Sequence, residues 1–284
     1  MTSSMFSKIH FPSVIGFEEV ELKELIKFID NQYREWDEIK FDKKTNFPKT
    51  YKDGTIKKRT IRPSKAKLNL VQRKTRELIL SKIELPTNVH GGRKKHSNIT
   101  NAKSHQGKKY ILTTDLKDFY PSVSHKTVYN TFIDLGFNKQ SSFYLTRFTT
   151  WKKELPQGTP TSTDISNIIF LKTDLELIEL CNERQITYTR YIDDLTFSAP
   201  FDFQNSIKDI IDIIKASKLK ISWRKTIYEG KQTVTGIIPL LNKITAPEKI
   251  LKKVEEEKQL PDNFLKPYTN YNNNIKKISK QKKK

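Results

Sequence analysis

Two adjacent carboxylates, Asp193 and Asp194, are the residues of this sequence best suited to chemistry. They lie between two short runs of β-favouring residues, Thr187 to Ile192 before them and Leu195 to Phe197 after them. This pattern predicts a β-hairpin whose two-residue tip carries both carboxylates. Because like charges repel, such a tip is a poor turn unless a divalent cation lies beside it. The pattern alone fits both a metal site and an ordinary solvated turn.

A third carboxylate, Asp115, follows a second predicted strand. Residues 109–114 (Lys-Tyr-Ile-Leu-Thr-Thr) are expected to form a largely buried strand, and the aromatic pair Phe119-Tyr120 comes one turn later. Carboxylates at strand ends are suitable ligands for oxygen-binding ions such as Mg²⁺. Two such ions about 3.5–4 Å apart activate an attacking 3′-hydroxyl and stabilise a leaving pyrophosphate oxygen. This chemistry needs carboxylates from two separate elements, which Asp115 and the Asp193-Asp194 hairpin supply.

A loop that contains proline and glycine separates the two carboxylate segments. It runs from Leu155 to Ser162 and includes Gln157 and Gly158. The apolar-rich run from Ile165 to Leu177 is predicted to be a helix. A glycine and an amide side chain at a helix entrance can contact a base pair or a phosphate, but a plain helix-capping loop fits these residues as well.

In this order and at this spacing, the three segments resemble motifs of the reverse transcriptase family. Asp115 with its aromatic pair resembles motif A, Leu155–Ser162 resembles motif B, and Tyr191–Asp194 resembles motif C, the Y-x-D-D box. The resemblance covers roughly residues 50–245. It implies an α+β right-hand polymerase with fingers, a palm made of an antiparallel sheet plus helices, and a short thumb.

The family resemblance also implies roles for single residues in catalysis. Asp115 and Asp193 would bridge two Mg²⁺ ions, with Mn²⁺ as an alternative ion, and Asp194 would be a weaker or second-sphere ligand. The backbone carbonyl of Leu116 would complete a metal shell. Lys225 resembles the motif D lysine, which is implied to donate a proton to the leaving pyrophosphate.

Four further residues are implied to bind the incoming nucleotide. Arg59, which begins a segment similar to the family's fingers, would meet the triphosphate. Tyr120 lies five residues after Asp115, where the family has its steric gate, and its ring would collide with a ribose 2′-hydroxyl. Gln157 and Gly158 would line the nascent base pair. An ordinary core position is the alternative for Tyr120.

Two shorter matches narrow the resemblance to the retron branch of the family. Residues 101–105 (Asn-Ala-Lys-Ser-His) match the N-A-x-x-H signature, and residues 234–236 (Val-Thr-Gly) match the V-T-G signature, which in that branch helps to recognise a structured RNA. A surface histidine and a strand that ends at a turn would fit the same residues. Ser222, where retron motif D has asparagine, and the short thumb are departures from the branch pattern. The residues predicted to bind RNA are Asn101, His105, Val234, Thr235 and Gly236.

The composition agrees with a partner that carries phosphate groups. Lysine and arginine number 53 against 32 acidic residues, a formal net charge of +21 over 284 residues. Such a balance is the electrostatic footprint of a nucleic-acid-binding protein. No apolar run approaches the ~20 residues of a membrane-spanning helix, so no membrane partner is expected. The single cysteine, Cys181, fits a reducing cytoplasm, which is the predicted location.

These landmarks predict four parts of the chain. They are a helical extension over residues 1–50, fingers over 51–108, a palm with motifs A to E over 109–245, and a short thumb with a basic tail over 246–284. The tail from Lys276 to Lys284 is expected to be disordered until it meets RNA. The extension has an apolar helical stripe of Val20, Leu22, Leu25, Ile26 and Ile29. Further helices are expected over Leu68–Leu85, Lys126–Leu135, Asp164–Gln185, Phe203–Ala216 and from Pro247 to about Lys258.

The sequence therefore predicts an RNA-directed DNA polymerase of retron type. It would copy a structured non-coding RNA into DNA by two-metal nucleotidyl transfer, in antiphage defence. Its expected partners are that RNA as template and primer, deoxynucleoside triphosphates, the RNA–DNA product and a separate effector protein. One alternative is another defence-associated or mobile-element reverse transcriptase. A catalytically idle palm that binds RNA as a scaffold is a second alternative, against which the intact Asp115, Asp193, Asp194 and Lys225 argue.

Overall fold

The structure is a computed structural model that describes residues 6–42, 47–51, 53–261 and 263–281. The chain forms two compact units, each made of two separate stretches of sequence. The first unit comprises Met1–Glu84 and Tyr120–Ile169, and the second comprises Leu85–Phe119 and Phe170–Lys284. The division into extension, fingers, palm and thumb stays a prediction.

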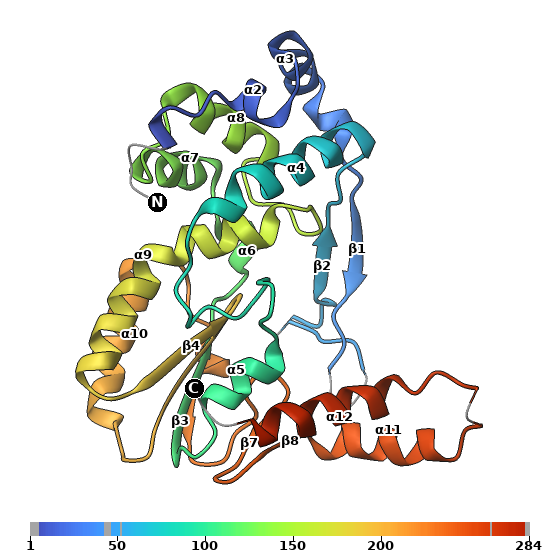
Figure 1. Ribbon diagram of the computed structural model, residues 1–284, viewed down its shortest axis with the longest axis vertical. Helices are drawn as coiled ribbons and strands as arrows, with labels where there is room; N and C mark the ends of the chain where they lie inside the picture. The colour runs from blue at the N-terminus through green and yellow to red at the C-terminus, as the bar shows by residue number, and fades with distance from the viewer. Residues whose placement is uncertain (1–5, 43–46, 52, 262, 282–284) are drawn as a thin grey trace. The chain divides into compact units, whose positions relative to one another are not determined.

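The first unit is mainly helical (Figure 1). It contains one antiparallel strand pair, β1 (Trp36–Ile39) and β2 (Lys58–Ile61). Two 3-10 turns, η1 (Ile29–Gln32) and η2 (Leu80–Lys82), follow helices of this unit. The helices are α2 (Phe11–Ile15), α3 (Glu19–Lys27), α4 (Ala66–Leu78), most of α6 (Phe119–Ser122), α7 (His125–Asp134), α8 (Lys139–Thr149) and the start of α9 (Ser162–Glu183).

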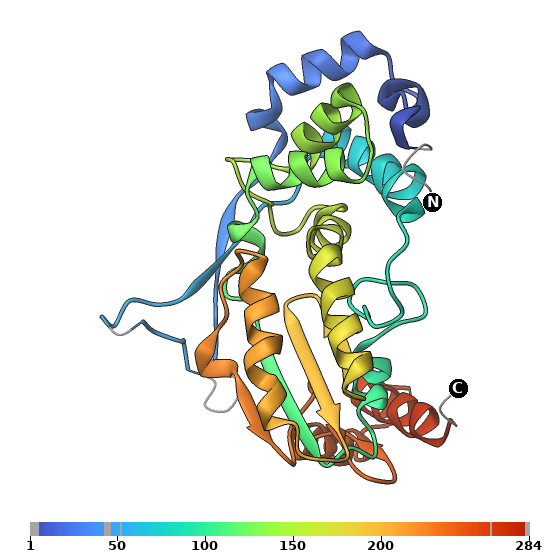
Figure 2. The same ribbon diagram turned by 90° about the vertical axis from the view of Figure 1, so that its left-hand side faces the viewer.

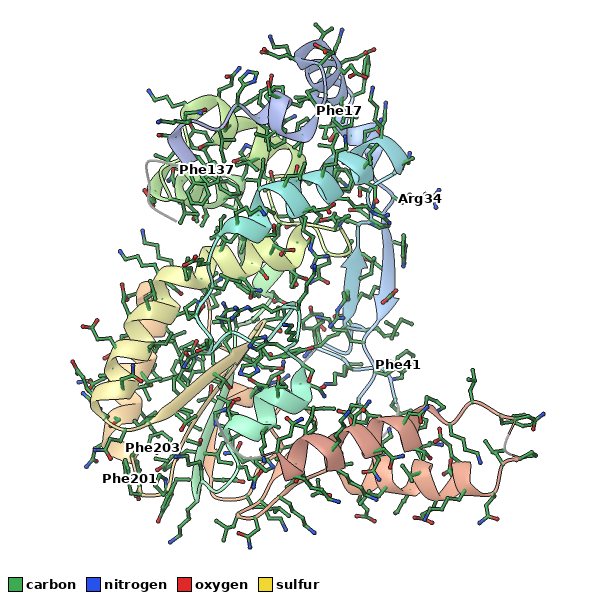
Figure 3. All side chains as sticks on the ribbon, viewed as in Figure 1. Phe17, Arg34, Phe41, Phe137, Phe201 and Phe203 are labelled. Atoms are coloured by element: carbon green, nitrogen blue, oxygen red, sulfur yellow. The ribbon has the colours of Figure 1, made fainter. Side chains whose placement is uncertain are left out.

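Aromatic rings fill much of the core of the first unit. The ring of Phe11 lies 5.4 Å from that of Tyr144 and 5.8 Å from that of Phe148. Phe137, labelled in Figure 3, packs edge to face against Phe132 with ring centroids 5.4 Å apart. Because aromatic pairs contribute beyond their buried area, these rings join α2 to α8 and fix the connection after α7.

Two helix predictions in this unit are wrong in part. The helix expected over Leu68–Leu85 ends at Leu78, where Ile79 is the C-cap and the chain continues as the 3-10 turn Leu80–Lys82. The helix cannot include Leu85, because the residue before a proline (here Pro86) disfavours the helical conformation. In the expected stripe of the extension, Val20 is 76% exposed and lies on the opposite face of α3 from the buried Leu22.

The second unit is built on a four-stranded antiparallel sheet with the strand order β4–β5–β3–β6. The strands are β3 (Tyr110–Asp115), β4 (Thr187–Tyr191), β5 (Asp194–Ala199) and β6 (Ile227–Glu229). The remainder of α9 and helix α10 (Ile207–Ala216) run alongside this sheet in Figure 2. Both central strands carry buried apolar residues, as expected for a sheet covered by helices. The predicted α+β fold with an antiparallel sheet plus helices is confirmed.

The C-terminal part of the second unit surrounds a separate apolar cluster. Its elements are α5 (Asn98–Ser104), the strand pair β7 (Ile238–Pro239) and β8 (Ile244–Thr245), α11 (Glu248–Lys258) and α12 (Pro267–Lys280). The cluster contains Ile99, Ala102, Ile111, Val234, Ile237, Ile244, Ala246 and Ile275. The helix predicted from Pro247 to Lys258 is confirmed as α11, with Pro247 at its N-cap.

The prediction that the tail from Lys276 is disordered is wrong for its first part. Residues up to Lys280 belong to α12, and residues 282–284 lie outside the described part of the chain. Ile275 is fully buried and Ile278 packs against the same cluster, so burial of an apolar face holds this lysine-rich segment in a helix. In the described part of the chain, no helix combines the length and apolarity needed to cross a bilayer.

Candidate functional site

The sheet of the second unit brings the three predicted acidic residues together. Asp115, the last residue of β3, is the direct cross-strand partner of Asp194, the first residue of β5. Side chains of directly paired residues leave the same face of a sheet. The backbone N–H of Leu116 donates to the carbonyl oxygen of Asp193 at 2.9 Å. Asp115 and Asp194 therefore lie on the two central strands at one end of the sheet, and Asp193 lies in the turn directly before β5.

The hairpin differs from the prediction in its tip. Ile192 and Asp193 are the two turn residues, whereas Asp194 belongs to β5 and pairs with Tyr191. Pairing of β5 with β3 extends to Asp194, so the sheet register holds this carboxylate in the strand. Ile192 has a φ of 59°, a region that β-branched residues rarely adopt. The turn is therefore strained at the residue directly before Asp193.

Lys225 lies beside these carboxylates. Its Nζ atom is 2.6 Å from Oδ2 of Asp115. The lysine ends a 3-10 turn (Trp223–Lys225) directly before β6, and the backbone N–H of Ser222 donates to the carbonyl of Asp115 at 2.7 Å. Asp115 is buried, while the Lys225 side chain is 59% exposed. Pairing of β6 with β3 thus places a largely exposed cation next to a buried carboxylate.

The acidic surroundings change the protonation of this lysine. Partial burial lowers the pKa of Lys225, but the hydrogen bond to Asp115 and the charges of Asp115, Asp194 and Asp193 outweigh this effect. The pKa of Lys225 is therefore raised above its ordinary value of 10.5, and the side chain is an ammonium at neutral pH.

Two carboxylates on neighbouring strands and one on the adjoining turn are the oxygen donors that Mg²⁺ takes, so the chemistry of the donor set fits this ion. As the side chains stand, however, no three acidic, histidine or cysteine residues of the described chain lie close enough together to hold a metal. The Lys225 ammonium donates to one of the two carboxylate oxygens of Asp115. Leu116 is buried next to Asp115, and metal binding by its carbonyl stays a prediction.

Arg59 and Tyr120, two of the predicted nucleotide-binding residues, lie in the first unit. Arg59 is exposed on β2 opposite Glu38 of β1. Tyr120 is half-buried in α6, with its hydroxyl 3.4 Å from the hydroxyl of Thr163 at the start of α9. Both side chains keep exposed surface, which their predicted roles require.

Gln157 and Gly158 are also in the first unit, in the loop before α9. The backbone N–H of Arg62 donates to the carbonyl of Gln157 at 2.7 Å. Gly158 has a φ of 100°, and a Cβ atom there would lie 3.2 Å from the side chain of Ile61. The loop is thus fixed against the end of β2, and only glycine adopts this backbone without strain.

Asn101 and His105 of the N-A-x-x-H match are fully buried. The two ring nitrogens of His105 lie 2.6 Å from the hydroxyl of Ser198 and 2.7 Å from that of Thr189. The histidine therefore ties α5 to strands β4 and β5. The contacts observed for these two side chains are internal, and an RNA contact by them stays a prediction.

The V-T-G match forms a tight turn that meets the same helix. Thr235 and Gly236 have φ values of 46° and 85°, and Val234 and Ile237 exchange backbone hydrogen bonds of 2.8 and 3.0 Å. The hydroxyl of Thr235 donates to the carbonyl of Asn98 at 3.1 Å and accepts from the amide of Asn101 at 3.3 Å. Val234 is buried, whereas Gly236 is exposed. The two retron-type signatures are therefore one structural assembly.

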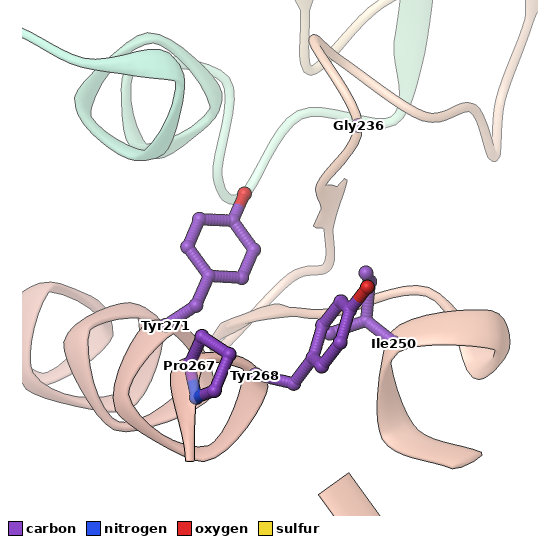
Figure 4. A pocket seen from close by; sticks show the side chains of 5 residues that line it. All are labelled: Gly236, Ile250, Pro267, Tyr268 and Tyr271. Atoms are coloured by element: carbon purple, nitrogen blue, oxygen red, sulfur yellow. The ribbon is translucent and has the colours of Figure 1, made fainter. Parts of the chain in front are cut away.

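An aromatic cavity of about 540 Å³ opens beside this turn (Figure 4). The amide of Asn98 donates to the hydroxyl of Tyr271 at 2.6 Å, which fixes that ring. Sequence reasoning missed the two tyrosines of this cavity, Tyr268 and Tyr271. Their i, i+3 spacing in a lysine- and asparagine-rich segment was the available signal. The lining residues are Gly236, Ile250, Pro267, Tyr268 and Tyr271.

Sequence reasoning also missed a buried ion pair next to the hairpin. Arg190, directly before Tyr191, and Asp174 on α9 are both fully buried. An arginine inside a run of β-favouring residues was the available signal, because an arginine that is buried in a strand almost always needs a charged partner.

An antiparallel sheet flanked by helices, with carboxylates at one end of its two central strands, defines a nucleic-acid polymerase palm. Residues 43–237 match the family model described as reverse transcriptase (RNA-dependent DNA polymerase), so the chain belongs to the reverse transcriptase family. The predicted family is thereby confirmed.

Relatives within this family are retron enzymes. The retron Ec86 reverse transcriptase of Escherichia coli is 34% identical over 190 residues, which cover 63% of this chain and 58% of that protein. The retron Se72 reverse transcriptase of Salmonella heidelberg is 28% identical over 237 residues, covering 79% of this chain and 59% of that protein. The chain thus spans less than two thirds of the length of either relative.

Among solved structures, a telomerase from Candida albicans in complex with a TWJ fragment of telomeric RNA is similar to this chain. The TM-score is 0.47 at 12% identity, over 80% of this chain and 50% of that one. This similarity is too low to support a conclusion.

Proposed function

We propose that this chain is an RNA-directed DNA polymerase of retron type. The observation that carries the proposal is the pairing of Asp115 with Asp194 across β3 and β5, with Asp193 bonded to Leu116 through its backbone. Family membership and the two retron relatives support it. The buried Asp115 is held on a central strand, as a preorganised site requires.

The reaction would be attack of a primer 3′-hydroxyl on the α-phosphorus of a deoxynucleotide. A phosphodiester bond forms, the bond to pyrophosphate breaks, and the hydroxyl proton leaves to solvent. Asp115, Asp193 and Asp194 would bind Mg²⁺, which neutralises phosphate charge when it is bound. Lys225 would donate its proton to the leaving pyrophosphate and regain it from water. Arg59, Gln157 and Gly158 would bind the nucleotide.

Lys225→Met is expected to lower the rate of nucleotide addition about 10²-fold, the usual contribution of a positioned proton donor. Because its pKa is raised above the ordinary 10.5, the wild-type lysine stays an ammonium through neutral and mildly alkaline pH. The alkaline limb of the rate should therefore not fall between pH 7 and 9.5. Single-turnover addition of dTTP to poly(rA)·oligo(dT) measures both effects. A rate for Lys225→Met within twofold of wild type would exclude Lys225 as the proton donor.

Sequencing of nucleic acid that copurifies with the protein tests the retron assignment. A discrete short DNA joined to a structured RNA, absent from Asp193→Asn preparations, is the expected result. Long repetitive DNA would favour a mobile-element enzyme instead, and bound RNA without DNA in both preparations would favour the idle scaffold. Comparison with and without RNase treatment shows whether the DNA depends on attached RNA.

We also propose that this DNA acts in antiphage defence together with a separate effector protein. The proposal derives from the resemblance to the retron branch. Phage plating on cells that carry the native locus, with and without Asp193→Asn, tests it. Equal plating on both strains would contradict the defence role.

We propose further that the aromatic cavity beside the V-T-G turn binds an unpaired base of the structured RNA. Tyrosine rings are sequence-tolerant stacking surfaces for bases, and Gly236 lets the backbone approach closely. Buried Glu257 accepts from the backbone N–H groups of Tyr268 and Thr269 at 2.9 and 2.7 Å. The start of α12 is thus already capped, which favours a base over a phosphate as the group bound here.

Tyr268→Leu combined with Tyr271→Leu is expected to weaken binding of the cognate RNA about tenfold or more, the usual effect of losing a base stack. Binding of random RNA of equal length should change much less. Tyr129→Leu, on α7 of the first unit, is the matched control. Filter binding measures all three proteins, and equal losses for both RNAs would mean that charge alone binds RNA at this end.

A further inference from the structure

The buried pair of Asp174 and Arg190 is saturated with hydrogen bonds. Both side chains have no exposed surface. Nε and Nη2 of Arg190 lie 2.9 and 2.6 Å from the two carboxylate oxygens of Asp174, and the Tyr188 hydroxyl donates to the same carboxylate at 2.7 Å. The guanidinium also stacks 5.0 Å from the ring of Phe170. This two-pronged contact fixes the orientation of the guanidinium plane.

The third nitrogen of that guanidinium reaches the catalytic turn. Nη1 of Arg190 donates to the carbonyl oxygen of Ile192 at 2.9 Å. Ile192 is the turn residue with the strained φ of 59°. A neutral apolar pair of similar size would fill the same space, but it would leave this carbonyl without its donor.

Backbone hydrogen bonds from a neighbouring segment, residues 88–90, also hold Arg190. The backbone of His90 donates to the carbonyl of Arg190 at 2.8 Å, and Arg190 donates to Asn88 at 2.9 Å, so residues 88–90 run along β4. A Cβ atom on Gly91 would lie 2.5 Å from the backbone nitrogen of Ile192. Glycine is therefore required where this segment meets the turn.

The Ile192–Asp193 turn is also linked to Asp115, the third carboxylate. The carbonyl of Asp193 accepts from Leu116, the residue after Asp115. The peptide between Ile192 and Asp193 carries the carbonyl that Arg190 binds, so its rotation moves the backbone of Asp193, from which both the Asp193 side chain and this Asp193 carbonyl extend. The path from Asp174 to Asp115 thus consists of consecutive hydrogen bonds and one strained residue.

We propose that Arg190, oriented by Asp174, is a positioning residue that holds the strained Ile192–Asp193 turn and so aligns Asp193 with Asp115. Its catalytic consequence rests on the proposed polymerase function, whereas its geometric part does not. Neither side chain touches the reacting atoms. The pair acts through the Ile192 carbonyl.

Two variants separate positioning from simple stability. Arg190→Lys keeps the positive charge. A single ammonium, however, cannot make both the paired hydrogen bonds to Asp174 and the hydrogen bond to the Ile192 carbonyl. The double variant Arg190→Met with Asp174→Leu removes both buried charges and keeps the volume, an exchange that often leaves stability unchanged. Leu177→Ala, on the same helix as Asp174, is a destabilised control whose side chain is fully buried.

Hydrogen exchange at the Leu116 amide is the readout that does not need polymerase activity. We expect the protection of the Leu116 amide to fall at least tenfold relative to the amides of β3 in both Arg190 variants. In Leu177→Ala it should change together with the β3 amides. We expect kcat on poly(rA)·oligo(dT) to fall tenfold or more, with KM for the primer–template within twofold. Normal Leu116 protection, or normal kcat with protection lost, would overturn the proposal, as would equal effects in Leu177→Ala.

The exchange measurement also separates this inference from the proposed function. If the wild-type protein adds no nucleotide, the polymerase proposal fails, and Leu116 protection still decides whether Arg190 holds the turn. If wild-type synthesis is normal and both variants match it, the positioning proposal alone fails.

Discussion

Asp193→Asn is expected to abolish DNA synthesis, with a loss of about 10³-fold or more, and to leave RNA binding unchanged. Asparagine keeps the side-chain size and the backbone bond from Leu116 to residue 193, so the turn should persist. The substitution removes a negatively charged metal ligand, which is worth several kcal/mol of transition-state stabilisation. Each loss of about 1.4 kcal/mol lowers the rate tenfold. Primer extension on an RNA template and filter binding of RNA measure the two effects.

The same variant should not be less stable than the wild type. It removes one of three neighbouring negative charges, and like charges repel in the folded protein. Asp118→Asn is the matched control, because Asp118 is an exposed carboxylate near Asp115 in sequence with no assigned role. Its φ of 48° is tolerated by asparagine. Synthesis that survives in Asp193→Asn, or an equal loss in Asp118→Asn, would contradict the catalytic assignment.

Tyr120→Val is expected to admit ribonucleotides, lowering the preference for dTTP over UTP about 10²-fold. The ring is half-buried in α6, and its hydroxyl makes only a long contact of 3.4 Å with that of Thr163. The bulk of the ring is therefore the feature expected to exclude a 2′-hydroxyl, and valine removes that bulk. The ratio of kcat/KM for dTTP and UTP on poly(rA)·oligo(dT) measures the change.

Tyr120→Phe separates the ring from its hydroxyl. It keeps the volume that would exclude a 2′-hydroxyl, so the preference for dTTP should stay within about threefold of wild type if bulk is the selective feature. A large loss in this variant would assign selectivity to the hydroxyl. Unchanged preference in Tyr120→Val would show that Tyr120 is a core residue, the alternative that the sequence left open.

Local patterns predicted most of the elements that carry the site. The strand before Asp115 follows from a largely apolar run, the hairpin around Asp193 from period-2 alternation, and the start of α11 after Pro247 from the fixed φ of proline. These features depend on neighbours a few residues away. They are therefore present in the sequence itself, together with the order of the acidic motifs.

Errors arose where distant segments decide the local conformation. Asp194 was expected at the tip, but pairing with Asp115 on β3 holds it in a strand. Lys276 was expected in a disordered arm, but burial of Ile275 extends α12 beyond it. Charge and composition describe the segment alone, whereas the free energy of burial depends on the surface that it meets.

The sequence by itself determined the family, the acidic residues and the secondary structure around them, because motif spacing and periodicity are local properties. Only the tertiary structure decided how those residues are held. The hydrogen bond between Asn101 and Thr235 joins residues 134 positions apart in the chain. Arg190 on β4 pairs with Asp174 on α9. A buried polar group is stable only when a partner meets it in the folded protein, and the identity of that partner is set by packing.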